Sequence, residues 1–264
     1  MKPANHKNGS IKINPFLSRY ATELRAWIGN TPVLGPAAHA FAKTAFGRWL
    51  RRGLSYLTFR RSSSFWERRY GKGGSSGSGS YGRLAAFKAE ILNDLVARRA
   101  IQSVVEFGCG DGAQLARAQY PRYVGIDVAQ GAVALCRERF AHDPTKQFYL
   151  ASELPADLGC FDLALSLDVI YHLVEDAVFD AYMRSLFAHA QKAVVIYSSN
   201  KTEPSGVPHV RHRRFTDWVQ LHAPEWRKVG YVANRYPFEP ARSWETSFAD
   251  FYIFERESAT VNHD

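Results

Sequence analysis

The sequence predicts an α/β fold built on a doubly wound, mostly parallel sheet, and three observations carry this prediction. From residue 81 onward, strand-like and helix-like segments alternate along the chain. A glycine-rich turn follows the first strand-like segment, at the kind of position where such sheets bind nucleotides. The sequence closes on two strand-like segments with no helix between them, which predicts an antiparallel pair at one edge of the sheet.

Each strand and helix is predicted from its pattern of apolar residues. Strands buried on both faces are short apolar segments, and five such segments span residues 103–107, 122–127, 146–150, 161–167 and 192–197. Apolar residues three or four positions apart predict helices over residues 82–99, 112–119, 130–141, 174–189 and 215–222. The terminal strand pair spans residues 226–233 and 247–254.

Length, composition and charge limit the class of protein. The chain has 264 residues, of which 46% are hydrophobic and 22% charged, and this composition excludes wholesale disorder, collagen-like repeats and coiled coil. The net charge of +9 lies in the N-terminal part, because residues 1–61 hold eleven Lys or Arg against the single acid Glu23. The remainder carries a net charge of −1, so nucleic-acid binding by the main domain is not expected.

The cysteines and the hydropathy pattern bear on the compartment. Cys109, Cys136 and Cys160 are odd in number and lack CxxC spacing, which argues against a disulfide framework. No apolar run approaches the ~20 residues that a membrane span needs, and no signal-peptide pattern is found at the N-terminus. These features predict a cytoplasmic protein.

Residues 1–61 predict a basic, helical N-terminal extension. Between residues 36 and 59 apolar side chains recur at helical spacing, while basic residues fall mainly on the other side. Two interpretations remain open, a peripheral contact with an anionic membrane surface and simple packing against the main domain. The main domain is expected over residues 82–257, followed by a disordered tail at 258–264.

An aromatic and Gly/Ser-rich segment, residues 62–81, separates the extension from the main domain. Nine of the ten residues 71–80 are Gly or Ser, a composition typical of flexible linkers. A Walker A loop is excluded, because Gly71-Lys72 is followed by glycine and the required upstream glycine is absent. The aromatic and cationic residues beside the segment favour the second interpretation, an active-site lid.

The strongest chemical signal is VVEFGCGDGA, residues 104–113. Its glycines let the backbone turn tightly and approach a ligand. Asp127 ends the next strand and is placed to accept hydrogen bonds from ribose hydroxyls. The glycines also satisfy the loose dinucleotide pattern GxGxxG/A, so a nicotinamide-dependent oxidoreductase is the alternative. Glu106 favours a ligand with a cationic amino group over a pyrophosphate.

With the terminal strand pair, three segments carry a family resemblance: EFGCGDG (106–112), GIDVA (125–129) and FDLALSLDVIYHL (161–173). Over roughly residues 81–255 the sequence resembles the class I S-adenosylmethionine-dependent methyltransferases. The resemblance implies an enzyme with a seven-stranded, Rossmann-like sheet and S-adenosylmethionine as cofactor.

The resemblance also assigns cofactor-binding residues. The methionine part of the cofactor is expected at Glu106, Gly108, Cys109 and Gly110, the ribose at Asp127, and the adenine at Val128. The acid that often meets the adenine amino group is missing from LASEL, so Ser152 or Glu153 must replace it. Leu167 and Asp168 are expected beside the methyl group.

His172 is the predicted catalytic residue. It follows Asp168 by four positions, and an imidazole titrates near neutral pH, so it can act as general base for a hydroxyl nucleophile. The alternative is a structural histidine that caps the next helix.

The loop PHVRHRRF, residues 208–215, is expected over the substrate. Its cationic side chains can bind a phosphate or carboxylate, and they are His209, Arg211, His212, Arg213 and Arg214. A solvated basic loop is the alternative. Asp168, His172 and two of these histidines resemble a divalent-metal site, but Tyr171 stands where a second acid is expected, so no metal is predicted.

The stretch FWERRYGKGGSSGSGSYGRLAAFKAEIL is similar to that of bacterial methyltransferases of polysaccharide or small-molecule biosynthesis. This likeness implies that Tyr70, Tyr81 and Arg83 close over the cofactor or substrate. It also implies O-methylation of a small anionic acceptor, such as a sugar or phosphorylated sugar. An inactive cofactor-binding scaffold at the membrane surface is the alternative from a different class.

Overall fold

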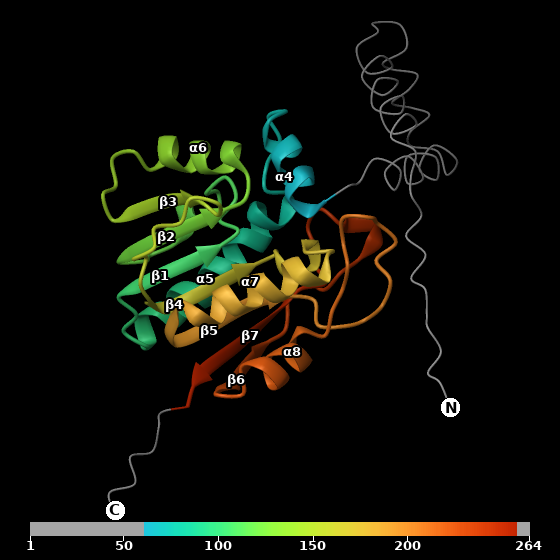
Figure 1. Cartoon of the computed structure of the whole chain (residues 1–264). Helices are drawn as coiled ribbons and strands as arrows, with labels where there is room; N and C mark the ends of the chain where they lie inside the picture. The colour runs from blue at the N-terminus through green and yellow to red at the C-terminus, as the bar shows by residue number, and fades with distance from the viewer. Residues whose placement is uncertain (1–60, 258–264) are drawn as a thin grey trace, which may run out of the picture. The chain divides into compact units, whose positions relative to one another are not determined.

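The structure is a computed structural model that describes residues 61–257. The predicted amphipathic helix at 36–59 and the predicted tail at 258–264 lie outside the described residues. Seven strands form one sheet in the order β3-β2-β1-β4-β5-β7-β6 (Figure 1). They are β1 (Ser103–Phe107), β2 (Arg122–Asp127), β3 (Lys146–Leu150), β4 (Phe161–Leu167), β5 (Ala190–Ser198), β6 (Trp226–Val232) and β7 (Asp250–Arg256).

The first five strands run parallel, and β7 pairs antiparallel with both β5 and β6. The predicted α/β fold, a mostly parallel seven-stranded sheet with an antiparallel terminal pair, is therefore confirmed. The predicted bounds of β1 to β4 match the structure. β7 begins at Asp250 rather than 247, because the side chain of Asn234 donates hydrogen bonds to the carbonyl oxygens of Ser247 and Ala249 just before the strand.

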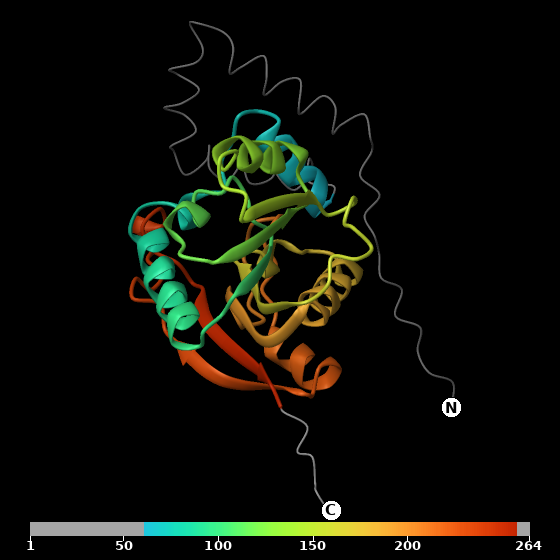
Figure 2. The same ribbon diagram turned by 90° about the vertical axis from the view of Figure 1, so that its left-hand side faces the viewer.

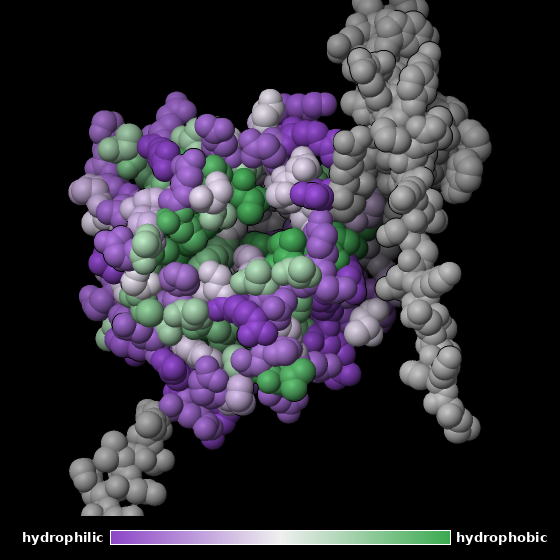
Figure 3. Space-filling view, viewed as in Figure 1, coloured by the Kyte–Doolittle hydropathy of each residue, from purple (hydrophilic) through white to green (hydrophobic). Residues whose placement is uncertain are grey.

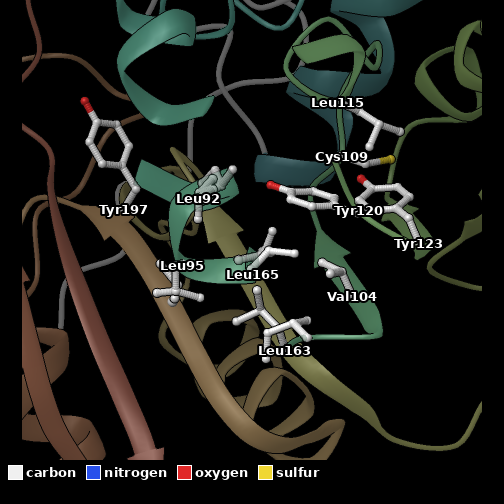
Figure 4. Close-up of a cluster of buried hydrophobic side chains, with 14 of the residues drawn as sticks. Leu92, Leu95, Val104, Cys109, Leu115, Tyr120, Tyr123, Leu163, Leu165 and Tyr197 are labelled. Atoms are coloured by element: carbon white, nitrogen blue, oxygen red, sulfur yellow. The ribbon is translucent and has the colours of Figure 1, made fainter. Parts of the chain in front are cut away.

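Helices cover both faces of the sheet, as the view along its edge shows (Figure 2). The helices are α4 (Ser62–Tyr70), α5 (Gly82–Arg98), α6 (Gln130–Arg139), α7 (Asp176–Ala188) and α8 (Phe215–His222). Val104 of β1 belongs to a buried cluster with Leu92 and Leu95 of α5 (Figure 4). Its neighbour Val105 belongs to the opposite cluster, with α7 and α8. This alternation explains why the parallel strands are continuous apolar segments.

The predicted helix at 112–119 is wrong, since only a short 3₁₀ turn, Leu115–Arg117, forms there. Gly112 has φ of +73°, which lies outside the right-handed helical region, so the chain turns where the helix was expected to begin. The Asp111 side chain then accepts a hydrogen bond from the Ala113 amide at 3.0 Å. This local bond replaces the first turn of a helix.

Candidate active site

A cavity of about 360 Å³ opens at the carboxyl ends of β1, β2 and β4. On the face that carries α7, hydrophobic residues gather around a hollow (Figure 3). Of the predicted cofactor-binding residues, eight line the cavity: Glu106, Gly108, Cys109, Gly110, Asp127, Val128, Leu167 and Asp168. Ser152 and Glu153 are not among its lining residues, whereas the neighbouring Ala151 is. The parallel sheet thus brings together residues that lie up to 62 positions apart in the sequence.

The glycine loop leaves no room for side chains. Gly108 and Gly110 have φ of +86° and +59°. A Cβ on Gly108 would lie 2.4 Å from Cγ2 of Val169, and one on Gly110 would lie 2.2 Å from Oγ of Ser76. Both positions therefore require glycine for backbone conformation and for space.

Glu106, the second-last residue of β1, carries a buried carboxyl group. Its side chain is 3% exposed and accepts a hydrogen bond from Oη of Tyr123 at 2.7 Å. Burial raises the pKa of Glu106 to about 7, while the Tyr123 bond and the nearby Lys88 ammonium act in the opposite direction. A cationic ligand group in the cavity would stabilise the ionised form.

Asp127 ends β2 and anchors the glycine loop. Its carboxylate accepts hydrogen bonds from the Gly110 amide and from the Ala129 amide, each at 2.9 Å. Burial raises the pKa of Asp127, and these amide bonds oppose the shift. Each carboxylate oxygen can accept more than one hydrogen bond, so Asp127 retains capacity for ribose hydroxyls.

Asp168 follows β4 in a left-handed conformation with φ of +61°, which is uncommon for a residue with a side chain. Oδ2 accepts a hydrogen bond from the Lys88 ammonium at 2.7 Å, and Oδ1 accepts one from Tyr171 at 2.8 Å. Lys88 is not among the site residues predicted from the sequence. Its position on the apolar face of α5, four residues from Leu84 and from Leu92, is the signal that could have found it.

His172 lies in a 3₁₀ turn after β4 and lines the same cavity. Its Nδ1 is 2.9 Å from the carbonyl oxygen of His209, which can only accept, so Nδ1 carries the proton. Burial lowers the pKa of His172 to about 4, and the ring is therefore neutral at physiological pH. In this tautomer Nε2 holds an unprotonated lone pair, as a general base requires.

Aromatic rings fix the orientation of His172. The ring contacts Trp66 edge to face at 4.9 Å and lies parallel to His209 with a centroid distance of 5.8 Å. His209 in turn stacks on Phe65 at 4.4 Å. Helix α4, which supplies Phe65 and Trp66, thus forms part of the wall beside the predicted base.

The basic loop at 208–215 lies beside His172 but does not line the cavity. Arg211 and Arg213 each lie 2.9 Å from Oδ1 of Asp176, and both donate to the carbonyl oxygen of Val174. Nδ1 of His212 is 2.7 Å from Oγ of Ser199. Arg214 lies 3.6 Å from Asp217. The loop is therefore tied to α7 and to the residue after β5 by the same side chains that were predicted to bind an anionic acceptor.

The Gly/Ser segment folds over the glycine loop. The Ser76 amide donates to Oδ2 of Asp111 at 3.1 Å, and the Asp111 amide donates to Oγ of Ser76 at 2.8 Å. Tyr70 and Tyr81 hold the ends of the segment, since their hydroxyl groups bond to Ser76 and Asp111. Ser76, Ser80 and Tyr70 line the cavity, whereas Tyr81 and Arg83 do not. Arg83 donates to the carbonyl oxygen of Glu245 at 2.7 Å.

Within residues 61–257 no three His, Cys, Asp or Glu side chains are grouped so that they could hold a metal ion. The helices of the same range are too short or too polar to cross a membrane.

The chain is similar to known methyltransferases in sequence and in fold. Residues 104–192 match a family described as a methyltransferase domain. A curated relative, mRNA cap guanine-N(7) methyltransferase 1 of Oryza sativa subsp. japonica, is 32% identical over 115 residues, which is 39% of this chain. The match spans 31% of that relative's length, about a third of it.

Two solved structures share the fold. N-methyltransferase NodS from Bradyrhizobium japonicum WM9, in complex with S-adenosyl-L-homocysteine, gives a TM-score of 0.59 at 14% identity, covering 75% of this chain and 100% of that one. Magnesium protoporphyrin IX methyltransferase from Synechocystis PCC 6803, also with bound S-adenosylhomocysteine, gives a TM-score of 0.51 at 16% identity, and the match covers 84% of this chain and 98% of that one. The predicted cofactor, S-adenosylmethionine, agrees with these findings. The methyltransferase-domain match over residues 104–192 and the seven-stranded sheet both agree with the class I S-adenosylmethionine-dependent methyltransferase family that the sequence resembles.

Proposed function

We propose that this protein is an S-adenosylmethionine-dependent methyltransferase that methylates a hydroxyl oxygen of a small acceptor such as a sugar or phosphorylated sugar. The observation that carries the proposal is His172, a neutral imidazole with an unprotonated Nε2, in the wall of the cavity that also contains the predicted cofactor residues. A volume of about 360 Å³ is within the usual range for a small-molecule site.

The residues of the cavity fit the cofactor. The glycine loop offers backbone without a Cβ at Gly108 and Gly110, and the buried Glu106 carboxyl group can accept hydrogen bonds from an ammonium group. Asp127 supplies acceptors at the end of the adjacent strand. When bound, the cofactor supplies an activated methyl group on a sulfonium, a good leaving group.

The protein then has two tasks, to orient the acceptor and to remove its proton. Asp168 follows β4 and lines the same cavity as the glycine loop and His172, with its carboxylate held by Lys88 and Tyr171. His172, fixed by its bond to the His209 carbonyl and by Trp66, takes the proton of the acceptor hydroxyl. The apolar residues Val169 and Leu173 in the same wall exclude water from this position.

The anionic character of the acceptor remains a prediction. Arg211 and Arg213, which the sequence analysis assigned to it, have Asp176 and backbone carbonyl groups as partners. Arg61, exposed at the edge of the cavity, is a cation that can contact an acceptor phosphate. Binding of an anionic acceptor would therefore use Arg61, or it would require Arg211 and Arg213 to leave their ion pairs with Asp176 of α7.

Replacing His172 with alanine is expected to lower turnover at least tenfold and to leave cofactor affinity nearly unchanged, because a positioned general base contributes roughly 100-fold or more. Transfer of labelled methyl groups to an acceptor panel measures this loss. The panel contains free sugars, sugar phosphates, nucleotide sugars and, since the curated relative is named for a cap, a capped RNA oligonucleotide. His222→Ala, at an exposed position on α8, is the control.

The pH profile provides an independent check on His172. With its pKa lowered to about 4, turnover at saturating cofactor should be constant at neutral pH and fall only as the pH approaches 4. Full activity of His172→Ala, or transfer to the cap guanine alone, would contradict the role of His172, since guanine N7 has no proton to remove.

A further inference from the structure

The turn that carries His172, residues 170–174, is held by the basic loop that follows β5. The carbonyl oxygen of His209 accepts a hydrogen bond from Nδ1 of His172 at 2.9 Å. The Arg211 amide donates to the carbonyl oxygen of Tyr171 at 2.7 Å. The proposed base and the residue before it are therefore fixed by backbone atoms of the loop.

The guanidinium of Arg213, on the same loop, bonds to the residues that follow His172. It donates to the carbonyl oxygens of Leu173 and Val174, the second at 2.9 Å, and to Oδ1 of Asp176 at 2.9 Å. Its Cζ atom also lies 4.7 Å from the ring centre of Phe179. The side chain is 11% exposed, so this guanidinium is a buried part of the fold and not a cation at the surface.

These bonds require an arginine. The 3₁₀ turn Ile170–His172 ends without continuing into a helix, so the carbonyl oxygens that follow need donors from elsewhere. A planar guanidinium carries several N–H donors in a fixed fork, and it can bind two adjacent carbonyl oxygens and a carboxylate together. A lysine ammonium keeps the charge without this geometry. Because the Asp176 side chain is 76% exposed and exposed ion pairs contribute little, the carbonyl bonds are what hold the turn.

Arg213 acts on the cavity through this turn. Leu173, whose carbonyl oxygen accepts from Arg213, lines the cavity, whereas Arg213 is not among the lining residues. An acceptor anion that engaged the guanidinium would have to displace the carbonyl groups beside His172. The contacts therefore favour support of the base over contact with an acceptor.

We propose that Arg213 is a positioning residue for His172. By holding the carbonyl groups that follow the imidazole, Arg213 keeps the ring in the cavity wall with Nε2 free to take the proton of the acceptor. The inference rests on the proposed function and deepens it, because it assigns the most buried arginine of the basic loop to the base and not to an acceptor anion.

Histidine NMR of the full chain tests this role without an acceptor or a cofactor. Burial lowers the pKa of His172 to about 4, so the wild-type ring should stay neutral, with the proton on Nδ1, from about pH 8 down to about pH 5. Arg213→Met frees the turn and admits water, so the pKa of His172 should rise toward its ordinary value and the ring should be protonated at about pH 5. The signal that is missing from His172→Ala assigns the resonance.

The charged groups that act on the ring are the same in wild type and variant. The His209 carbonyl and Asp168 raise the pKa of His172, whereas burial, the His209 imidazole and the Arg69 guanidinium lower it. A titration that moves in Arg213→Met therefore reports a change in the position or burial of the ring.

Arg184→Met is the matched control. Arg184 also pairs with an aspartate of α7, Asp180, at 2.9 Å, and it also lies over an aromatic ring, that of Trp218, at 5.9 Å. Its side chain is 57% exposed, and these partners lie on α7 and α8. The titration of His172 should be unchanged in this variant.

Turnover measurements with the acceptor panel distinguish positioning from acceptor binding. Arg213→Met is expected to lower kcat about tenfold or more for charged and uncharged acceptors alike and to leave KM within about threefold, because a displaced base slows the proton transfer. In a His172→Ala background the same substitution should change kcat less than about twofold, since both changes act on one step.

The possible results have distinct meanings. An unchanged titration and tautomer of His172 in a folded Arg213→Met protein overturns the proposal. If that variant does not fold, Arg213→Lys, which keeps the charge without the fork, is measured in its place, and an unchanged titration has the same meaning. An undiminished loss of kcat in the His172→Ala background, or a rise in KM confined to phosphorylated acceptors, also overturns the proposal and leaves the proposed function intact. Full turnover of His172→Ala contradicts the proposed function, and the NMR titration then still decides whether Arg213 holds the ring.

Discussion

Replacing Glu106 with glutamine is expected to weaken S-adenosylmethionine binding about 30-fold or more. The amide keeps the shape of the side chain and can still accept the bond from Tyr123, but it removes the buried charge that we propose pairs with the cofactor ammonium. Removing one partner of a buried, hydrogen-bonded charge pair costs about 2 kcal/mol or more. Calorimetric titration measures the loss, and Glu90→Gln, which changes an exposed acid on α5, is the control.

The same carboxyl group predicts a pH dependence of binding. Burial raises the pKa of Glu106 to about 7 in the free protein, with Asp127 and Asp168 acting in the same direction and Lys88 and Tyr123 against it. Below pH 7 the group must lose its proton to bind an ammonium, so affinity should be about tenfold weaker at pH 6 than at pH 8. Glu106→Gln should abolish this dependence. Equal affinity of the wild-type protein at both pH values would contradict the role of Glu106.

Replacing Gly110 with alanine is expected to destabilise the fold by about 2 to 5 kcal/mol. A left-handed backbone costs a residue with a Cβ about 1 to 2 kcal/mol, and overpacking costs about 1 to 3 kcal/mol. The added Cβ would lie 2.2 Å from Oγ of Ser76 and 3.1 Å from Oη of Tyr70, so it also displaces the Gly/Ser segment from the cavity. Thermal unfolding measures the loss of stability, and calorimetric titration with S-adenosylmethionine measures the loss of affinity at the cavity.

Two further variants separate strain from crowding. Gly159 has φ of +74°, and its Cβ would meet nothing closer than a carbonyl oxygen at 3.9 Å, so Gly159→Ala should cost only about 1 to 2 kcal/mol. Adding Ser76→Gly to Gly110→Ala removes the closest contact and should recover part of the lost stability. Equal losses for Gly110→Ala and Gly159→Ala would show that the Gly/Ser segment does not press on the loop.

The sheet and the glycine loop after β1 were predictable because their signals are local. Strands such as β1 (Ser103–Phe107) are buried on both faces and are therefore short, continuous apolar segments bounded by turns. The carboxyl ends of parallel strands lie at one edge, so Glu106, Asp127 and Asp168 had to approach one another once the strands were identified. The adenine contact expected at Ser152 or Glu153 stays a prediction, since Ala151 occupies that part of the wall.

The contacts that complete the site were not predictable, because they join residues far apart in the sequence. Lys88 and Asp168, which are hydrogen-bonded, lie 80 positions apart in the sequence, and the hydrogen-bonded Ser76 and Asp111 lie 35 positions apart. Arg213 and Asp176 are separated by 37 positions, so the sequence showed the cations of the 208–215 loop without the acid that binds them. Charge and spacing alone do not distinguish a structural ion pair from a substrate site.

Calorimetric titration of the full chain with S-adenosylmethionine tests the central claim most directly, with Asp127→Ala and reduced nicotinamide dinucleotide as comparisons. We expect one micromolar site in the wild-type protein, clearly weaker binding by Asp127→Ala, and no binding of the dinucleotide. A folded wild-type protein that binds the dinucleotide and not S-adenosylmethionine would contradict the account.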